Sequence, residues 1–155
     1  MNPWVNSPKI IGSTEMMPMN AKVFLDTNLL IYYTADNLDK KQRVHDLLLS
    51  TASVHISTQV INEFVAVTVR KGIHSRDDAI RYAIEFMELF TVIPIDMAIV
   101  RRSFSLMVKY GYSNWDSLIL AAALVHSCTR LFSEDLQHGQ IIDRRLTITN
   151  PFTSS

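Results

Sequence analysis

The sequence predicts an α/β fold in which helices cover both faces of a central parallel sheet. Short runs rich in β-branched and aromatic residues alternate with longer stretches of helical periodicity. Such alternation is typical of parallel strands, because each needs a crossover connection to reach the next. The chain has 155 residues, which fits a single domain.

The N-terminal half is predicted to contain two strands and four helices. The first strand, Lys22–Leu25, ends at Asp26, and the helix that follows reaches Tyr33. Gly72 stops a later helix, as glycine often does just beyond a helix C-terminus. The remaining elements expected in this half are a helix over about 40–50, a strand at 54–56 and helices over 58–71 and 75–89.

The C-terminal half is predicted to contain three further strands and two helices. Gly111 ends the first helix, and Ser113 opens the second. The stretch from Trp115 to Val125 is apolar nearly all round, which predicts a helix in the interior. In chain order we expect a strand at 91–94, helices over 96–110 and 113–127, and strands at 130–132 and 146–149.

Residues 1–20 differ from the rest of the chain because they contain three prolines, a glycine and scattered polar residues without periodicity. We interpret them as a loose leader ahead of one domain over residues 21–152. Met16, Met17 and Met19 precede the first predicted strand, so we hypothesise that translation begins there. N-terminal sequencing of protein made from the native gene tests this, and a chain that starts at Met1 contradicts it.

Composition excludes several classes of protein. The longest apolar run, Leu118 to Val125, has eight residues, whereas a membrane-spanning helix needs about 20. We see no secretory signal, and the single cysteine, Cys128, fits a reducing compartment, so we expect a cytoplasmic protein without membrane contacts. Fifteen basic residues balance fifteen acidic ones, so net charge gives no general attraction to nucleic acid.

Four acidic residues lie where strands end or where the next helix begins: Asp26, Glu63, Asp116 and Asp135. Ligands of open parallel sheets bind outside the carboxyl ends of the strands, so these side chains can converge there. A bare cluster would repel itself, and a hard cation such as Mg²⁺ or Mn²⁺ removes that conflict. The pattern therefore suits metal-assisted attack of water on a phosphodiester.

Each acid also has a purely structural interpretation. Asp26 could cap the helix that follows it. Glu63 lies at the edge of an apolar stripe, where solvated glutamates are common. Ser113–Asp116 resembles a capping box. Asp135 could be an ordinary loop residue, and the adjacent Glu134 leaves open which of these two acids belongs to the site.

Taken together, these segments resemble the PIN-domain family, in matching order from about Ala21 to Phe152. The ordered set carries the resemblance, because no single motif is specific. The matching segments are Val23–Asn28 (opening strand with its aspartate), Asn62–Phe64 (glutamate of the third helix), Asn114–Ile119 (aspartate of the buried helix), Phe132–Asp135 (hydroxyl-x-aspartate after the fourth strand) and Thr147–Phe152 (closing strand of many VapC-like toxins).

The resemblance implies a three-layer α/β/α fold with a central parallel sheet of four to five strands. It also implies a Mg²⁺- or Mn²⁺-dependent endoribonuclease that acts as the toxin of a type II toxin–antitoxin system, with a cognate antitoxin and a homodimer. The leader before Met19 is absent from most such toxins, which puts the start codon in doubt. The implied catalytic and metal-binding residues are Asp26, Glu63, Asp116 and Asp135, with Asn28 and Ser133 orienting them by hydrogen bonds.

Several further residues are candidates for contact with RNA. Tyr32 and Tyr33 could stack on a base, although packing is the favoured interpretation. The five histidines show no metal-ligand spacing, and Cys128 is interpreted as an inert apolar residue. The basic residues that could contact phosphates, if they share the face of the carboxylates, are Arg70, Lys71, Arg101, Arg102, Lys109, Arg144 and Arg145.

Competing functions are distinguished by small motifs. Scattered glycines exclude a dinucleotide-binding domain and a P-loop. A phosphoacceptor receiver domain needs a second acid after the first strand, where this chain has Thr27 and Asn28. Two alternatives stay open: a non-catalytic PIN-like module that binds RNA or a protein, and a nuclease directed at DNA.

Overall fold

The structure is a computed structural model that describes residues 17–154, and a six-stranded sheet forms its centre. Most of the predicted leader, residues 1–16, lies outside the described residues. The strands are ordered β3-β2-β1-β4-β6-β5, and all neighbours pair in parallel except β5 and β6. Their bounds are β1 Lys22–Leu25, β2 Ser53–Ser57, β3 Thr91–Ile93, β4 Arg130–Phe132, β5 Ile141–Ile142 and β6 Leu146–Thr149.

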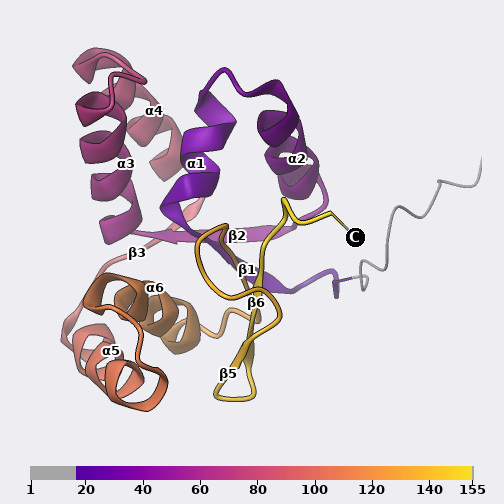
Figure 1. The fold of residues 1–155 in the computed structure, drawn as a ribbon, viewed down its shortest axis with the longest axis vertical. Helices are drawn as coiled ribbons and strands as arrows, with labels where there is room; N and C mark the ends of the chain where they lie inside the picture. The colour runs from indigo at the N-terminus through magenta and orange to yellow at the C-terminus, as the bar shows by residue number, and fades with distance from the viewer. Residues whose placement is uncertain (1–16, 155) are drawn as a thin grey trace, which may run out of the picture.

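The six helices of residues 17–154 cover the two faces of this sheet. Helices α1 to α4 lie on one face, and α5 and α6 lie on the other (Figure 1). The α/β fold with helices on both faces, predicted from the alternating sequence pattern, is confirmed. The bounds are α1 Thr27–Thr34, α2 Leu38–Leu49, α3 Thr58–Arg70, α4 Arg76–Leu89, α5 Met97–Tyr110 and α6 Asn114–Val125. None of the helices in residues 17–154 has the length and apolar character needed to cross a membrane.

The direction of the chain across the sheet explains the two helical layers. From β1 the chain moves to β2 and β3, and it then returns past β1 to form β4. Because crossover connections are right-handed, reversing the direction moves the helices to the opposite face. The strand order therefore reverses between β1 and β4, which makes this point the expected ligand site of an open α/β sheet.

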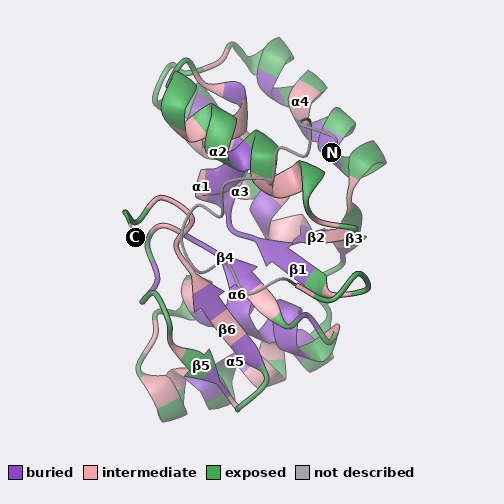
Figure 2. Cartoon of the chain, turned by 90° about the vertical axis from the view of Figure 1, so that its right-hand side faces the viewer, coloured by how far each residue is buried: buried purple, intermediate pink, exposed green. Residues whose placement is uncertain are grey.

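The core lies on both faces of the sheet, against α1–α4 on one side and against α5 and α6 on the other. Residues 117–124 of α6 are all buried, as the all-round apolar pattern predicted (Figure 2). The first turn departs from that prediction, because Trp115 is 63% exposed. In β1, Val23, Phe24 and Leu25 are all buried, as expected of a central strand covered on both faces.

Serine caps and left-handed residues set the ends of several helices. Ser57 and Ser113 accept hydrogen bonds from the backbone N–H groups of Val60 and Asp116, which starts α3 and α6. Gly111 has a φ of 74° and ends α5 where predicted. Helix α6 stops at Val125 instead of reaching 127, because Ser127 takes a left-handed φ of 61°.

The strand count corrects the prediction of four to five parallel strands. The additional strand, β5, has two residues and pairs antiparallel with β6. The turn between them places Asp143 and Arg144 at φ values of 47° and 58°. A pattern search misses such a hairpin because the strand is very short and the turn lacks the glycine that normally marks it.

Candidate active site

One cavity at the carboxyl ends of β1 and β4 contains all four predicted carboxylates. Its volume is about 510 Å³. The cavity lies at the strand-order reversal, where the fold predicts a ligand site. The polar residues that line it are Asp26, Thr27, Asn28, Tyr32, Glu63, Arg70, Lys71, Asp116, Glu134 and Asp135.

Asp26 lies deepest of the acids and is 6% exposed. Its Oδ1 accepts a hydrogen bond of 2.7 Å from the backbone N–H of Thr27, and its Oδ2 accepts one of 2.7 Å from the Ser133 hydroxyl. Asp26 therefore caps α1 and lines the cavity at once. Burial raises its pKa to about 6 against the effect of these hydrogen bonds, and the charges of Glu63 and Asp135 raise it further.

Glu63 reaches the cavity from the second turn of α3. Its Oε2 accepts a hydrogen bond of 2.8 Å from the Thr27 hydroxyl, and its Oε1 accepts one of 2.9 Å from the side-chain amide of Gln59. Gln59 also donates to the backbone oxygen of Trp115 over 3.2 Å. Both oxygens of Glu63 are thus oriented by neutral donors, and one amide group connects α3 to the first turn of α6.

The loop after β4 is organised around the fully buried Ser133. The Ser133 hydroxyl donates to Asp26 and accepts from the backbone N–H groups of Asp135 and Leu136 over 3.2 and 3.3 Å. The side-chain amide of Asn28 donates to Asp135 Oδ2 over 3.1 Å. Asn28 and Ser133 therefore each bind a carboxylate by a hydrogen bond, and their orienting role stays a prediction.

Asp116 lies in the first turn of α6, and its backbone N–H donates to Ser113 Oγ over 3.1 Å. The cap predicted from the sequence is therefore present. The Asp116 carboxylate also lines the cavity, and it accepts no hydrogen bond from any of residues 17–154. The nearby Tyr112 has a raised pKa, mainly from burial and also from the charge of Asp116.

Glu134 differs from the other acids because a lysine neutralises it. Lys40 Nζ lies 2.5 Å from Glu134 Oε1, and the Tyr32 hydroxyl donates to Glu134 Oε2. Burial alone would raise the pKa of Glu134, but the hydrogen bonds from Lys40 and Tyr32 outweigh it and hold the pKa below its ordinary value. Of the two adjacent acids, Asp135 is therefore the one without a cationic partner among residues 17–154.

The acids have the donor chemistry for a hard cation but are not gathered around one point. Within residues 17–154, no group of three or more histidine, cysteine, aspartate or glutamate side chains could hold a metal ion as it stands. Hydrogen bonds from hydroxyls and amides hold Asp26, Glu63 and Asp135 instead. The buried atoms that have no hydrogen-bond partner among residues 17–154 include Oε1 of Gln59, whose amide binds Glu63, and Oγ of Ser117, which follows Asp116 in the chain. Oxygen donors, negative charge and unpaired polar atoms all fit Mg²⁺ or Mn²⁺.

A sequence model of the PIN domain matches residues 23–142. The chain belongs to the PIN-domain family. The match begins in β1 and ends in β5, so it covers all four carboxylates of the cavity. The family predicted from the ordered motifs is thereby confirmed.

Solved structures of bacterial toxins share the fold of this PIN domain. A toxin–antitoxin complex from Klebsiella pneumoniae has a TM-score of 0.63 at 22% identity, covering 84% of this chain and 98% of that one. VapC20 of Mycobacterium tuberculosis, a toxin that cleaves the sarcin–ricin loop, has a TM-score of 0.62 at 18% identity, and the match covers 74% of this chain and 92% of VapC20. DNA-bound VapBC from Salmonella typhimurium has a TM-score of 0.65 at 16% identity, and the match covers 84% of this chain and 98% of that one. No curated protein matches the sequence.

The basic residues predicted to contact phosphates fall into three groups. Arg70 and Lys71, at the end of α3, line the cavity with the carboxylates. Arg102 and Lys109, on α5, instead bind Asp143 in the turn between β5 and β6. Three other predicted phosphate contacts do not line the cavity, namely Arg101, Arg144 and Arg145.

Sequence reasoning missed Gln59 and the Lys40–Tyr32–Glu134 cluster. Gln59 precedes Glu63 by four residues, a spacing that puts both on one helix face and could have revealed the contact. Lys40 gives no comparable signal, because its partner lies 94 positions away. Cys128 matches its interpretation as inert, since it is buried and burial raises the pKa of its thiol to about 12.

Proposed function

We propose that this chain is a metal-dependent endoribonuclease that hydrolyses RNA phosphodiester bonds as the toxin of a type II toxin–antitoxin system. One observation carries the proposal. Asp26 at the end of β1, Glu63 in α3, Asp116 at the start of α6 and Asp135 in the loop after β4 come from four separate segments and line one cavity at the strand-order reversal. Acids that share one cavity, with a perturbed pKa among them, are typical of functional sites. Here burial first, and the neighbouring acids last, raise the pKa of Asp26 to about 6.

Mg²⁺ or Mn²⁺ is the proposed cofactor, held by the four acids directly or through water. Mg²⁺ usually keeps several waters and uses only one or two carboxylates, so it does not require a preformed group of three acids. The bound cation supplies the positive charge that the acids lack and stabilises negative charge on the phosphate during attack by water.

The residues of the chain orient the acids and hold the substrate. Ser133 fixes Asp26 and the backbone of Asp135, while Thr27 and Gln59 fix the two oxygens of Glu63. We propose that Arg70 and Lys71 bind phosphates on either side of the cleavage site, because they share the cavity with the acids. Phosphate contacts place the strand without reading its sequence.

A cognate antitoxin is the proposed protein partner. Support comes from the similar folds found in toxin–antitoxin complexes. A second cavity, of about 810 Å³, is lined by residues of α1, α2 and α4, including Leu38 and Leu89. These leucines are 77% and 67% exposed, so an apolar antitoxin segment would bury them. We propose that the complex forms in the cytoplasm, in keeping with a single free thiol.

A homodimer is proposed on the exposed face of α5. Met97, Phe104 and Val108 follow a spacing that places them on one stripe of the helix, and they are 67%, 54% and 90% exposed. Light scattering of the purified protein should give twice the chain mass. Val108→Glu should shift the mass to one chain, and an unchanged monomeric mass in both proteins would contradict the dimer.

The ribonuclease is tested by incubating antitoxin-free protein with total RNA and with single- and double-stranded DNA, in Mg²⁺, Mn²⁺ or EDTA. We expect metal-dependent cleavage of RNA by the wild type and none by Asp26→Asn. Asp77→Asn is the matched control, because Asp77 is an exposed aspartate on α4 away from the cavity. Cleavage of DNA alone would favour the DNA-directed nuclease. Binding of RNA without cleavage would favour the non-catalytic module.

A further inference from the structure

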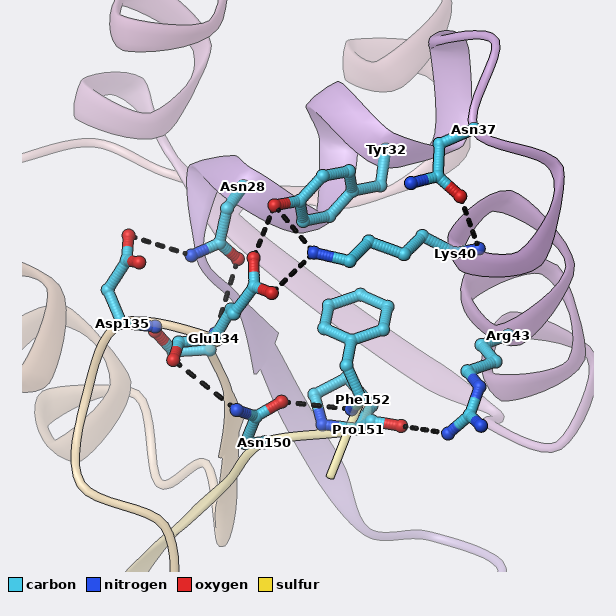
Figure 3. Close-up of polar contacts among 11 residues, drawn as sticks. Asn28, Tyr32, Asn37, Lys40, Arg43, Glu134, Asp135, Asn150, Pro151 and Phe152 are labelled. Carbon is cyan, nitrogen blue, oxygen red and sulfur yellow. Dashed lines mark hydrogen bonds and ion pairs between the residues drawn. The ribbon is translucent and has the colours of Figure 1, made fainter. Parts of the chain in front are cut away.

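A second set of polar contacts surrounds the active-site loop from the side of α2. Lys40 Nζ lies 2.5 Å from Glu134 Oε1 and donates to the Tyr32 hydroxyl over 3.0 Å. The Tyr32 hydroxyl in turn donates to the other oxygen of Glu134. Figure 3 shows the three side chains pointing toward one another from α1, α2 and the loop after β4. Both oxygens of Glu134 are therefore engaged, although the residue lines the catalytic cavity.

The segment after β6 closes over this cluster. Phe152 packs edge-on against Tyr32, with ring centroids 5.2 Å apart, and Lys40 Nζ lies 4.1 Å from the Tyr32 centroid and 5.1 Å from that of Phe152. Asn150 accepts from the backbone N–H of Phe152 over 2.9 Å and donates to the backbone oxygen of Glu134 over 3.4 Å (Figure 3). The ammonium group is thus held between a carboxylate and two aromatic rings.

Three side chains connect the loop after β4 to the rest of the domain. Ser133 binds Asp26 and the backbone of Asp135. Glu134 binds Lys40 and Tyr32. Asn28 of α1 contacts both acids of the loop, because its Oδ1 accepts from the Glu134 backbone N–H at 3.5 Å and its amide donates to Asp135 at 3.1 Å.

We propose that Lys40 is a positioning residue of the active site. It binds Glu134 and thereby fixes the loop that presents Asp135 to the cavity, and it keeps Glu134 out of the set of acids that binds the metal ion. The proposal rests on the ribonuclease function proposed above. Without Lys40, Glu134 would be a fifth uncompensated carboxylate beside Asp135, and like charges in one site repel one another.

The test compares Lys40→Met, Glu134→Gln and the double variant with two controls. Lys41→Met removes the neighbouring exposed lysine, which does not line the catalytic cavity. Lys40→Arg keeps the positive charge and should restore the wild-type behaviour. The first measurement is hydrogen exchange of the Asp135 backbone N–H in metal-free protein, because this group is bonded to Ser133.

We expect Lys40→Met and Glu134→Gln to speed this exchange by similar factors, with the double variant no faster than the single variants, because all three break the same interaction. Mn²⁺ affinity should fall roughly tenfold in each, the usual effect of losing a partner that orients a metal ligand. For RNA cleavage, kcat should fall with little change in KM, since Lys40 and Glu134 bind each other and act through the position of Asp135. Lys41→Met should change none of these quantities.

Other outcomes overturn the proposal in distinct ways. If Glu134 binds the metal, Glu134→Gln weakens Mn²⁺ binding while Lys40→Met leaves it unchanged or tightens it. Unchanged exchange at Asp135 in both single variants shows that Lys40 does not position the loop. If the wild type neither binds Mn²⁺ nor cleaves RNA, the proposed function fails, yet the exchange measurement still decides whether Lys40 holds the loop.

Discussion

Asp26 and Asp143 both lie at turns of the same sheet, but their electrostatic surroundings are opposite. Asp143, between β5 and β6, accepts hydrogen bonds from Lys109 over 2.7 Å and from the Tyr110 hydroxyl over 2.8 Å, and it pairs with Arg102. Among residues 17–154, Asp26 receives only neutral donors, from Ser133 and the backbone of Thr27. One carboxylate is neutralised within the fold, and the other is not.

The pKa directions follow from this difference. The hydrogen bond from Lys109 is the main cause that lowers the pKa of Asp143. Burial raises the pKa of Asp26 to about 6. Glu134 follows the pattern of Asp143, because Lys40 neutralises it and its pKa is low despite burial. We infer that a cationic partner gives Asp143 and Glu134 a structural role, whereas the cavity carboxylates that lack one within residues 17–154, such as Asp26, form the active site.

The largest effect is expected for Asp26→Asn. RNA cleavage should fall by more than about 100-fold. Loss of a residue that only orients a metal ligand costs up to about 100-fold in activity, and loss of a ligand itself should cost more. The metal-free variant should be at least as stable as the wild type, because the substitution removes a buried charge that lacks a cation. Cleavage rates and thermal unfolding without metal measure both quantities. A variant that is both active and less stable would contradict the comparison.

Ser133→Ala should have the next largest effect. It removes the hydroxyl that donates to Asp26 and accepts from the backbone of Asp135 and Leu136. Cleavage should fall roughly 10- to 100-fold. The free energy of unfolding should fall by about 1–3 kcal/mol, because buried polar groups lose their partners. Ser103→Ala is a matched control, since Ser103 is equally buried but lies on α5. Unchanged cleavage by Ser133→Ala would count against its role.

Removing the charge of Arg70 or Lys71 should weaken RNA binding several-fold and leave the fold intact. The logarithm of the binding constant falls linearly with the logarithm of the salt concentration. Each substitution to alanine should reduce the steepness of this line by roughly 0.7, the value for one phosphate contact to single-stranded nucleic acid. Arg101→Ala is the control, because this exposed arginine on α5 does not line the cavity. Equal effects at Arg70 and Arg101 would show that the basic cavity rim has no special role.

Asp143→Asn should have the smallest effect, confined to stability. Its carboxylate is largely buried and paired, so the loss should be about 1 kcal/mol. Because the folded-state pKa is lowered, the contribution is complete above the ordinary aspartate value of 3.8 and disappears as the pH falls through the lower folded value. Unfolding measured at neutral pH and near pH 3 should show the two proteins converge at acidic pH. A difference that persists or grows there would contradict the assignment.

Much of the fold could be predicted because its signals are local. The helix ends at Ser57, Ser113 and Gly111 depend on residues within one turn. The buried helix α6 is evident from its composition, and the alternation of strands and helices predicts the layers. The strand β5 could not be predicted in this way, because two residues and an Asp143–Arg144 turn carry too little pattern.

The candidate site also has features that follow from the sequence and features that do not. Carboxyl ends of parallel strands meet at one edge, so the approach of Asp26 and Asp135 follows from topology alone. The pairing of Lys40 with Glu134 depends on how α2 packs beside the loop after β4, which no local pattern records. The sequence therefore predicts which acids can form the site, whereas the side-chain contacts within residues 17–154 show that Glu134 is neutralised and the others are not.

The most direct test of the central claim is calorimetric titration of Mn²⁺ into the metal-free wild type, Asp26→Asn and Asp143→Asn. If uncompensated carboxylates form a metal site, the wild type and Asp143→Asn should bind Mn²⁺ with the same affinity and Asp26→Asn should lose most of it. No binding to the folded wild type, or equal binding to all three proteins, would contradict the account.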